Sequence, residues 1–475
     1  MLFPTVEFAV FFVLTFTASW LLRPRPRAWK VFMVGASLWF YGWFQPWYTL
    51  LLCGSSLFNW AAAHAIGVSR RRDGEGPRAR WILASAVAAN LAALSFFKYY
   101  DFFWTSVADA LGALGIRVGP PTLQVLLPVG ISFFTFQAIS HLVDVFRGST
   151  EPRSLLDFTV YMSFFPRLVA GPIVRSEEFF PQLRVADPRR VRAARALSMI
   201  LRGLFKKVVV SSWLATAVVD PVFGVPEAHS ALDVLVAIYG YAVQIYADFS
   251  GYTDIAIGCA LLLGFRLPDN FDAPYRALSV QEFWRRWHMT LSRWLRDYLY
   301  IPLGGNRVGP RRRNVNLMLT MLLGGLWHGA AWNFVLWGGI HGLALVGERE
   351  VGARWLSGRL PDRFVPVVRW LVTFHVVSLA WVFFRAEDTA SAWGVLWRLV
   401  TGLGAESTID PGVLRLALLV VAGSIALQFA SGRSRLEGFL ERAPWPVHAA
   451  VLAVGLVLLD VLGPEGVAPF IYFRF

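Results

Sequence analysis

Two histidines, His288 and His328, are the side chains of this sequence best suited to acid–base chemistry. His328 lies in the segment 317–346, which is apolar and contains no Asp, Glu, Lys or Arg. A titratable ring inside such a segment is costly to place in a bilayer, so its presence indicates a function. Because imidazole has an ordinary pKa of about 6.5, it can take a hydroxyl proton at neutral pH. The sequence therefore predicts His328 as a general base.

His288 lies in a second segment, 279–307, which divides into two faces when it is drawn as one helix. His288 falls on the apolar face with several tryptophans, while arginines and acids occupy the other face. This division is typical of a helix at a bilayer surface or against a transmembrane bundle. A histidine on the apolar face is either paired with a buried partner or used in chemistry, so His288 is the second candidate.

A third histidine, His341, follows in the same apolar segment as His328. One straight helix through 317–346 would be about 45 Å long, enough to cross a hydrocarbon core of about 30 Å. On that helix His341 would point about 220° away from His328, so we interpret it as a structural hydrogen-bonding group. The glycine pairs at 324–325 and 338–339 are places where the helix can bend or approach a neighbour. The residues expected to line the site around His288 and His328 are Trp284, Trp287, Trp327, Gly329 and Trp332.

Long motifs in these two segments carry a family resemblance. FWRRWHMTLSRWLRDYLYIPLGGNR at 283–307 is followed by LLGGLWHGAAWNFVLWGGIHG at 322–342. With LPVGISFFTFQAISHLVDVFRG at 127–148 and YADFSGYTDIAIGCALLLGFRLPDNFDAPYRA at 246–277, the chain resembles the membrane-bound O-acyltransferases, in particular their bacterial alginate O-acetylation branch. The resemblance spans nearly the whole chain. It implies that the histidine of the WHG motif, His328, is catalytic and that His288 is its usual companion.

The resemblance also implies a reaction and its participants. An acetyl group would leave a cytoplasmic thioester donor, acetyl-CoA, and reach an exported polysaccharide such as alginate, with no bound cofactor. The cavity would open to the cytoplasm for the donor and to the outside for the acceptor. An extracytoplasmic acetyl-handling protein is the expected partner. From the residues themselves, the absence of a Gly-x-Ser-x-Gly motif and of a reactive-cysteine setting favours direct transfer over a covalent enzyme intermediate.

Composition defines the class of protein. The chain has 475 residues, of which 56% are hydrophobic, 15% aromatic and only 16% charged, as in an all-helical polytopic membrane protein. The net charge of +14 comes from arginines grouped between apolar segments, a pattern that follows the positive-inside rule and argues against nucleic-acid binding. Cys53 and Cys259 have no nearby His or Cys at metal-ligand spacing, so no metal site is expected.

The apolar segments predict the topology. We expect roughly ten to twelve membrane helices in one domain, 1–475, with re-entrant or interfacial amphipathic helices around a central cavity that contains the histidines. Residues 1–22 lack a basic leader and a cleavage site, so they are expected to remain as a first span with the N-terminus outside the inner (cell) membrane. Residues 31–67 are expected to form two spans broken near Gln45 and Pro46, and later spans are expected near 366–385, 411–430 and 446–463.

Polar residues inside the apolar segments offer further candidates. Asp248 and Asp254 would lie about 240° apart on a helix, so with Ser250 we interpret them as structural or cavity-lining groups and not as a paired-carboxylate site. Lys206 and Lys207 are expected to extend toward the headgroups, with attraction of an anionic acyl donor as the alternative. Gln137, His141 and Asp144 share one helical face. We favour interhelical hydrogen bonds for these three side chains over a role in lining the reaction cavity.

Three other functions remain open from the sequence. A transporter or polysaccharide channel would show inverted repeats or several intramembrane charges on one axis. A non-catalytic subunit of an export complex would not need His328. Within the acyltransferases, a relative that moves D-alanine onto teichoic acid shares much of the FWRRWH and FSGY pattern, whereas PLGGNR and LWHGAAWNF favour the acetylating branch.

Overall fold

The computed structural model describes residues 1, 3–117, 119, 123, 126–183, 193–351, 360–430 and 443–463. This part of the chain is helical and contains no β-strand, which confirms the predicted all-α class. Six of its helices are long and apolar enough to cross a membrane, and Val6–Leu22 and Pro446–Leu462 are shorter apolar helices. The chain divides into two compact units, Met1–Arg192 with Cys259–Pro268, and Ala193–Gly258 with Asp269–Phe475.

The first unit is built on long helices that expose apolar side chains, as expected for helices facing lipid. Its members are α1 (Val6–Leu22), α2 (Pro26–Gly42), α3 (Tyr48–Asp73), α4 (Pro77–Ala113), α5 (Ile131–Arg147), α6 (Leu155–Ser163), α7 (Phe165–Leu168), α8 (Ser176–Phe179) and η1 (Phe180–Leu183). The gap between α2 and α3 confirms the predicted break at Gln45 and Pro46. Helix α5 is buried on nearly every side and packs with α3 and α4 around Ile66, Ala86 and Leu142.

His141 lies in the middle of α5 and is completely buried. Its ring packs against Phe158 at 5.0 Å and Phe180 at 5.7 Å between ring centroids. Neither of its ring nitrogens has a hydrogen-bond partner among the described residues. The expected interhelical hydrogen bond of His141 is therefore wrong, and aromatic packing holds this ring in place.

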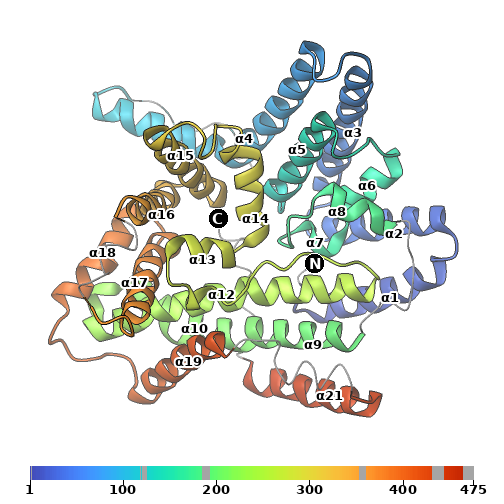
Figure 1. Cartoon of the computed structure of the whole chain (residues 1–475). Coiled ribbons are helices and arrows are strands. Elements are labelled where there is room, and N and C mark those ends of the chain that lie inside the picture. Colours follow the sequence, from blue (N-terminus) through green and yellow to red (C-terminus); the bar gives the residue numbers. More distant parts are fainter. Residues whose placement is uncertain are drawn as a thin grey trace. The chain divides into compact units, whose positions relative to one another are not determined.

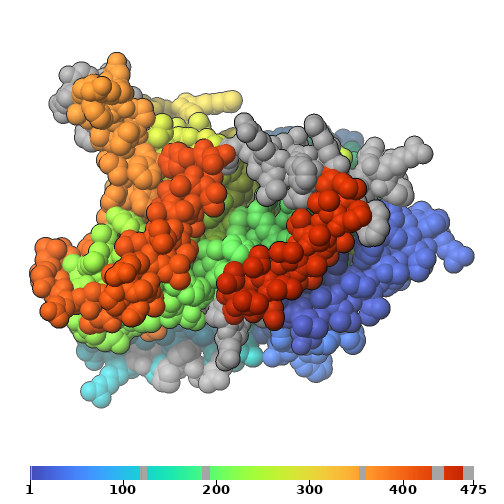
Figure 2. All heavy atoms as spheres, turned by 90° about the horizontal axis from the view of Figure 1, so that it is seen from below, coloured from blue at the N-terminus to red at the C-terminus, as the bar shows by residue number. Residues whose placement is uncertain are grey.

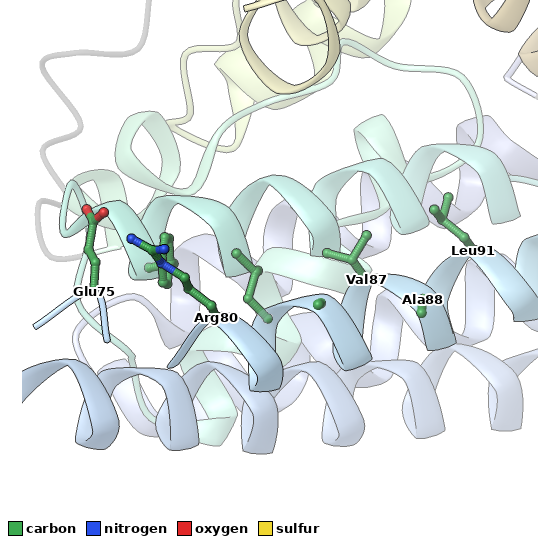
Figure 3. A pocket seen from close by; sticks show the side chains of 8 residues that line it. Glu75, Arg80, Val87, Ala88 and Leu91 are labelled. Atoms are coloured by element: carbon green, nitrogen blue, oxygen red, sulfur yellow. The ribbon is translucent and has the colours of Figure 1, made fainter. Parts of the chain in front are cut away.

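An open groove of about 650 Å³ follows α4 on the surface of the first unit. Figure 3 shows Glu75 and Arg80 at one end and Val87, Ala88 and Leu91 along the apolar remainder. None of the residues predicted to do chemistry lines this groove.

The second unit contains both candidate histidines. A nearly continuous helix runs through α9 (Ala193–Leu204), η3 (Phe205–Ser211), α10 (Ser212–Leu214), η4 (Ala215–Val219) and α11 (Asp220–Gly224), followed by η5 (Pro226–Ala228). The η3 and η4 stretches are π-helical, a winding that is rare and often marks functional sites. This helix lies alongside α12 (Ala231–Leu262) in Figure 1.

The remaining helices of this unit are η6 (Pro274–Arg276), α13 (Val280–Arg286), α14 (Met289–Leu295), η7 (Arg296–Tyr300), α15 (Pro310–His328), α16 (Trp332–Val351), α17 (Val365–Arg385), α18 (Thr389–Thr401), α19 (Pro411–Phe429) and α21 (Trp445–Leu462). Helices α17, α19 and α21 lie where the sequence predicted spans near 366–385, 411–430 and 446–463. Figure 2 shows α21 lying across the outside of α9, against which it packs.

The segment 317–346 is not one helix, contrary to the prediction. Helix α15 ends at His328, Gly329 is extended, and α16 starts at Trp332 and runs back antiparallel to α15. The hairpin is tight because glycines meet at its centre, with Gly325 against Gly338. Apolarity alone cannot distinguish one long helix from two helices packed in a hairpin, which is why the sequence pattern missed the turn.

The segment 279–307 is also broken where the sequence predicted one helix. Helix α13 ends at Arg286, and α14 starts at Met289 after His288, whose backbone is left-handed with φ 40° and ψ 54°. Trp287 and His288 at the break and Leu291 of α14 are still buried, as the helical wheel predicted. The helical wheel therefore predicted which of these residues are buried, although it did not predict the break between α13 and α14.

Candidate active site

The fold brings His288 and His328 together from two different segments. Their ring centroids are 6.4 Å apart, and both side chains are buried, His328 with 3% of its surface exposed. An oxygen atom that hydrogen-bonds to both rings at about 2.8 Å would lie about 4 Å from each centroid, so this separation corresponds to a roughly tetrahedral angle at that oxygen. The pair is therefore spaced to hold one hydroxyl or carbonyl oxygen between the two imidazoles.

His328 is the last residue of α15 and lies at the turn of the α15–α16 hairpin. Its ring packs edge-on against Trp337 at 5.0 Å and Phe384 at 5.2 Å, and Trp327 lies 5.0 Å away. These rings come from α15, α16 and α17, so three helices enclose the histidine. Since the neighbours are aromatic, the site has an apolar wall that keeps bulk water away from the ring.

His288 lies at the junction of α13 and α14. Phe249 of α12 packs edge-on against its ring at 4.7 Å, and Trp327 lies 6.0 Å away. Neither ring nitrogen of His288 has a hydrogen-bond partner among the described residues. A fully buried imidazole with no such partner costs stability, and His288 differs from the equally buried His141 in that a second histidine ring lies 6.4 Å away.

The other residues predicted for the site lie at different distances from it. Trp327 is buried beside both histidines, and Gly329 forms the hairpin turn, where a Cβ atom would meet the Phe334 ring at 2.1 Å. Trp287 is buried against Phe271 and Trp381. By contrast, Trp332 is 57% exposed at the start of α16. Trp332 therefore lies on the surface at the turn of the hairpin, whereas Trp327 is buried against the two histidine rings.

His341 makes the hydrogen bond to a neighbouring helix that the sequence suggested. Its Nδ1 accepts a hydrogen bond from Nε1 of Trp284 at 3.3 Å, and its ring stacks on Phe283. The argument from opposite helical faces does not hold, because the helix is broken and Trp337 contacts both His328 and His341. The interpretation stands on a different observation, which is that His341 already has a partner.

The acidic residues of α12 pair with the cations of α9 and η3. Lys207 forms a buried ion pair with Asp248, their side chains being 2% and 3% exposed. Asp254 binds Arg202 through two hydrogen bonds of 2.9 Å and Lys206 at 2.8 Å. The expectation that Lys207 extends to the headgroups is therefore wrong. Close contact of the two helices at Gly203 and Gly251 keeps this lysine inside the protein. Ser250 accepts a further bond from Lys206 at 3.2 Å.

A cavity of about 690 Å³ opens beside this pair of helices, and Asp254 and Ser250 are among the residues that line it, whereas His288 and His328 are not. Its charged lining consists of three basic and three acidic residues, namely Arg195, Arg202, Lys206, Asp254, Asp269 and Asp272. Burial raises the pKa of Asp269, and the neighbouring charges of Asp254 and Asp272 raise it further, against the opposing effect of Arg195 and Arg202. A more protonated Asp269 shifts the charge of the lining toward positive.

Two phenylalanines separate this cavity from His288. Phe271 lines the cavity and packs against Phe249 at 5.1 Å, and Phe249 in turn contacts the histidine ring. The cavity therefore lies one layer of aromatic rings from the histidine pair. Sequence reasoning did not name Phe249 as a site residue, although it lies in the YADFSGY motif at 246–252, because the motif does not show that this ring faces His288.

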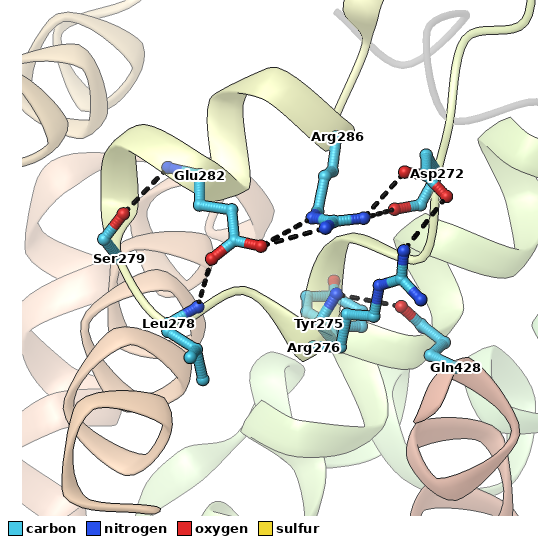
Figure 4. A network of polar contacts seen from close by, with 8 residues as sticks. All are labelled: Asp272, Tyr275, Arg276, Leu278, Ser279, Glu282, Arg286 and Gln428. Atoms are coloured by element: carbon cyan, nitrogen blue, oxygen red, sulfur yellow. Dashed lines mark hydrogen bonds and ion pairs between the residues drawn. The ribbon is translucent and has the colours of Figure 1, made fainter. Parts of the chain in front are cut away.

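A polar network fixes the segment that leads to His288. Arg286 bonds Glu282 at 2.9 Å and Asp272 at 2.6 Å, and Glu282 also accepts the Leu278 N–H at 2.9 Å. Figure 4 shows this chain of contacts together with the bond from the Tyr275 N–H to Gln428. The arginine-rich face of the predicted helix is thus partly used to hold α13 against the 269–276 loop. Among the described residues, no group of three or more His, Cys, Asp or Glu is arranged to hold a metal ion.

Comparisons with known proteins identify the relatives of the chain. A family model described as MBOAT, membrane-bound O-acyltransferase family, matches residues 122–385. The chain is 37% identical to the probable alginate O-acetylase AlgI of Pseudomonas aeruginosa, over 89% of this chain and 81% of that protein. It is 38% identical to the peptidoglycan O-acetyltransferase of Helicobacter pylori, over 85% and 79%. The teichoic acid D-alanyltransferase of Streptococcus thermophilus is 27% identical over 60% and 75%.

Proposed function

Because the chain belongs to the membrane-bound O-acyltransferase family, we propose that this acyltransferase moves an acetyl group onto a hydroxyl of an exported polysaccharide, with His328 as the general base. The observation that carries the proposal is the pairing of His328 with His288, whose ring centroids are 6.4 Å apart and whose side chains are buried among aromatic rings. The spacing suits one acceptor oxygen held between the rings, as transfer to a hydroxyl requires.

The proposed reaction is direct transfer. The acceptor hydroxyl donates its proton to a ring nitrogen of His328 as its oxygen attacks the thioester carbonyl. An N–H of His288 donates to the same acceptor oxygen and holds it between the two rings, while negative charge develops on the carbonyl oxygen of the thioester. Collapse of the tetrahedral intermediate forms the ester and breaks the carbon–sulfur bond, and the thiolate takes the proton from His328. The aromatic enclosure of His328 keeps water from competing with the acceptor.

Acetyl-CoA is the proposed donor, used as a substrate and not as a resident cofactor. The cavity beside α12 supports this choice, since its volume of about 690 Å³ falls within the roughly 300–1,000 Å³ of small-molecule sites. Its basic residues Arg195, Arg202 and Lys206 can face phosphate oxygens. The cavity lies close to the histidine pair, separated from His288 by the Phe271 and Phe249 rings.

The acceptor is proposed from the relatives. Those named for O-acetylation of alginate or peptidoglycan are 37% and 38% identical over 89% and 85% of this chain. The D-alanyltransferase of teichoic acid is 27% identical over 60% of it, so acetyl transfer to a cell-envelope or exported glycan is favoured over D-alanyl transfer. We place the enzyme in the inner membrane with its N-terminus outside, where an extracytoplasmic acetyl-handling protein would receive or deliver the group.

The test is the ester content of the secreted polysaccharide in a deletion strain that carries the wild-type protein, His328→Ala or His341→Ala at matched membrane levels. We expect His328→Ala to abolish acetylation and His341→Ala to retain most of it, because His341 is bonded to Trp284. Normal acetylation by His328→Ala would favour a transporter or a non-catalytic subunit. Release of D-alanine in place of acetate on mild base treatment would favour the D-alanyl alternative.

A further inference from the structure

The segment after His288 lacks the usual means of starting a helix. His288 is the residue before α14, and its side chain makes no capping hydrogen bond to that helix. The first N–H groups of an α-helix have no partner within the helix and are normally satisfied by the side chain at this position. If His288 performed that capping role, its ring would be directed at its own backbone and would not be available to His328.

Asn270, in the loop before η6, supplies the missing bonds. Its main-chain oxygen accepts the Met289 N–H at 2.9 Å. Its Oδ1 accepts the Thr290 N–H at 3.3 Å and the Thr290 hydroxyl at 2.7 Å. The first two N–H groups of α14 are therefore capped by a residue from another part of the chain, which leaves the His288 imidazole free of that task.

The backbone of His288 explains why such a clamp is needed. Its φ of 40° lies in the left-handed region, which is strained for most residues other than glycine and persists only where the surroundings hold it. Asn270 fixes the two residues that follow His288, and the Asp272 N–H bonds the Arg286 oxygen at 2.9 Å on the other side. The loop at 270–272 thus forms backbone hydrogen bonds to the chain both before and after His288.

The same loop also controls the ring of His288. Phe271, next to Asn270, packs on Phe249 at 5.1 Å, and Phe249 packs on the His288 ring at 4.7 Å. Asn270 and Phe271 both line the cavity beside α12. The wall of the cavity is therefore the element that sets the position of the histidine.

On these observations, and resting on the proposed function, we propose that Asn270 is a positioning residue for acyl transfer that caps α14 in place of His288 and so presents the imidazole to His328. Asn270 touches neither histidine ring in any described contact, so it acts through His288. Its orientation is fixed, because a backbone N–H can only donate and the atom facing Thr290 must be the amide oxygen. Its Nδ2 is buried and has no partner among the described residues, so the cap alone accounts for the bonds that hold this side chain.

The test measures transfer by the full-length protein in nanodiscs. The probes are acetyl-CoA and deacetylated polysaccharide from the host, and the rate is followed as free CoA thiol. Asn270→Ala is expected to lower kcat at least tenfold while the KM for acetyl-CoA changes less than twofold. Asn270→Asp keeps an oxygen for both Thr290 bonds and is as good a cap as Asn, so it is expected to return kcat to within about fivefold of wild type. Asn314→Ala, which removes an amide bonded to Glu350 at the protein surface, is the matched control and should retain the wild-type kcat.

Each outcome separates the two proposals. A wild-type kcat for Asn270→Ala, or an Asn270→Asp variant no better than Asn270→Ala, would overturn the positioning role while leaving the histidine mechanism intact. Activity of His328→Ala in the same assay would instead overturn the proposed function. If Asn270→Ala does not accumulate in membranes, Thr290→Val removes the hydroxyl bond alone and is expected to lower kcat two- to fivefold. An unchanged kcat for Thr290→Val would then refute the clamp.

Discussion

The glycine contact at the centre of the α15–α16 hairpin gives the sharpest prediction about what positions His328. A Cβ atom on Gly338 would lie 2.3 Å from the Met321 carbonyl oxygen, whereas real Cβ contacts are essentially never shorter than 3.0 Å. Gly338→Ala therefore forces the two helices at least about 0.7 Å apart at that point. Because α15 continues directly from Met321 to His328, the separation is transmitted to the histidine.

The expected effects follow from that displacement. Overpacking of this kind costs about 1–3 kcal/mol of stability. A shift of about 1 Å in a catalytic group can cost about a hundredfold in rate, so we expect Gly338→Ala to lower kcat for acetyl transfer by about one to two orders of magnitude. The neighbouring Gly339→Ala is the matched control, since its Cβ would have no contact nearer than 3.6 Å, to Leu322. It should remain within about twofold of wild type, because Ala is tolerated or favoured in a helix interior.

The assay is the rate of acetyl transfer by purified protein in nanodiscs, together with the midpoint of thermal unfolding for each variant. The comparison between adjacent glycines removes general effects of mutating this hairpin. If Gly338→Ala and Gly339→Ala have the same kcat, close approach of α15 and α16 does not set the position of His328, and the reasoning is wrong.

Three further predictions concern the surroundings of the site. Lys207→Met should destabilise the protein by about 3–5 kcal/mol because it removes the cation that balances the buried charge of Asp248. Adding Asp248→Leu should recover most of the thermal midpoint, and equal midpoints for the single and double variants would contradict this. Trp284→Phe removes the bond to His341 and should cost about 0.5–1.5 kcal/mol with kcat within threefold, whereas a loss of transfer at unchanged stability would show that His341 takes part in the reaction. Phe249→Leu removes one of the two aromatic rings between the cavity and His288. Water should then hydrolyse the thioester more readily, so the release of CoA without acceptor, measured as free thiol, should rise severalfold. No rise would mean that these rings do not exclude water.

The sequence predicts the candidate residues His288 and His328 more readily than the backbone conformation that brings them together. A histidine in an uncharged apolar segment is conspicuous, so His288 and His328 could be predicted together, and the structure pairs their rings. The glycine pairs were predicted as places of bending or close approach, and Gly325 and Gly338 do meet. These features are local and are visible in residue type and spacing.

What the sequence could not predict depends on contacts between distant segments. The turn at Gly329 interrupts a run of apolar residues whose pattern suits one helix as well as two. Asn270 is an ordinary polar residue in a loop until the fold sets it against Met289 and Thr290. The lysine at position 207 was expected at the headgroups because no local pattern revealed that Asp248 would face it.

The most direct measurement is the transfer of radiolabelled acetyl from acetyl-CoA to deacetylated host polysaccharide by the purified full-length enzyme in proteoliposomes, comparing wild type with His328→Gln. Glutamine fills similar space but cannot take the hydroxyl proton at neutral pH. The account predicts labelled, base-labile ester on the polysaccharide with the wild-type protein and a loss of at least about a thousandfold in the variant, close to the upper range of general base catalysis. Wild-type labelling by His328→Gln would contradict the central claim that this histidine is the base of the transfer.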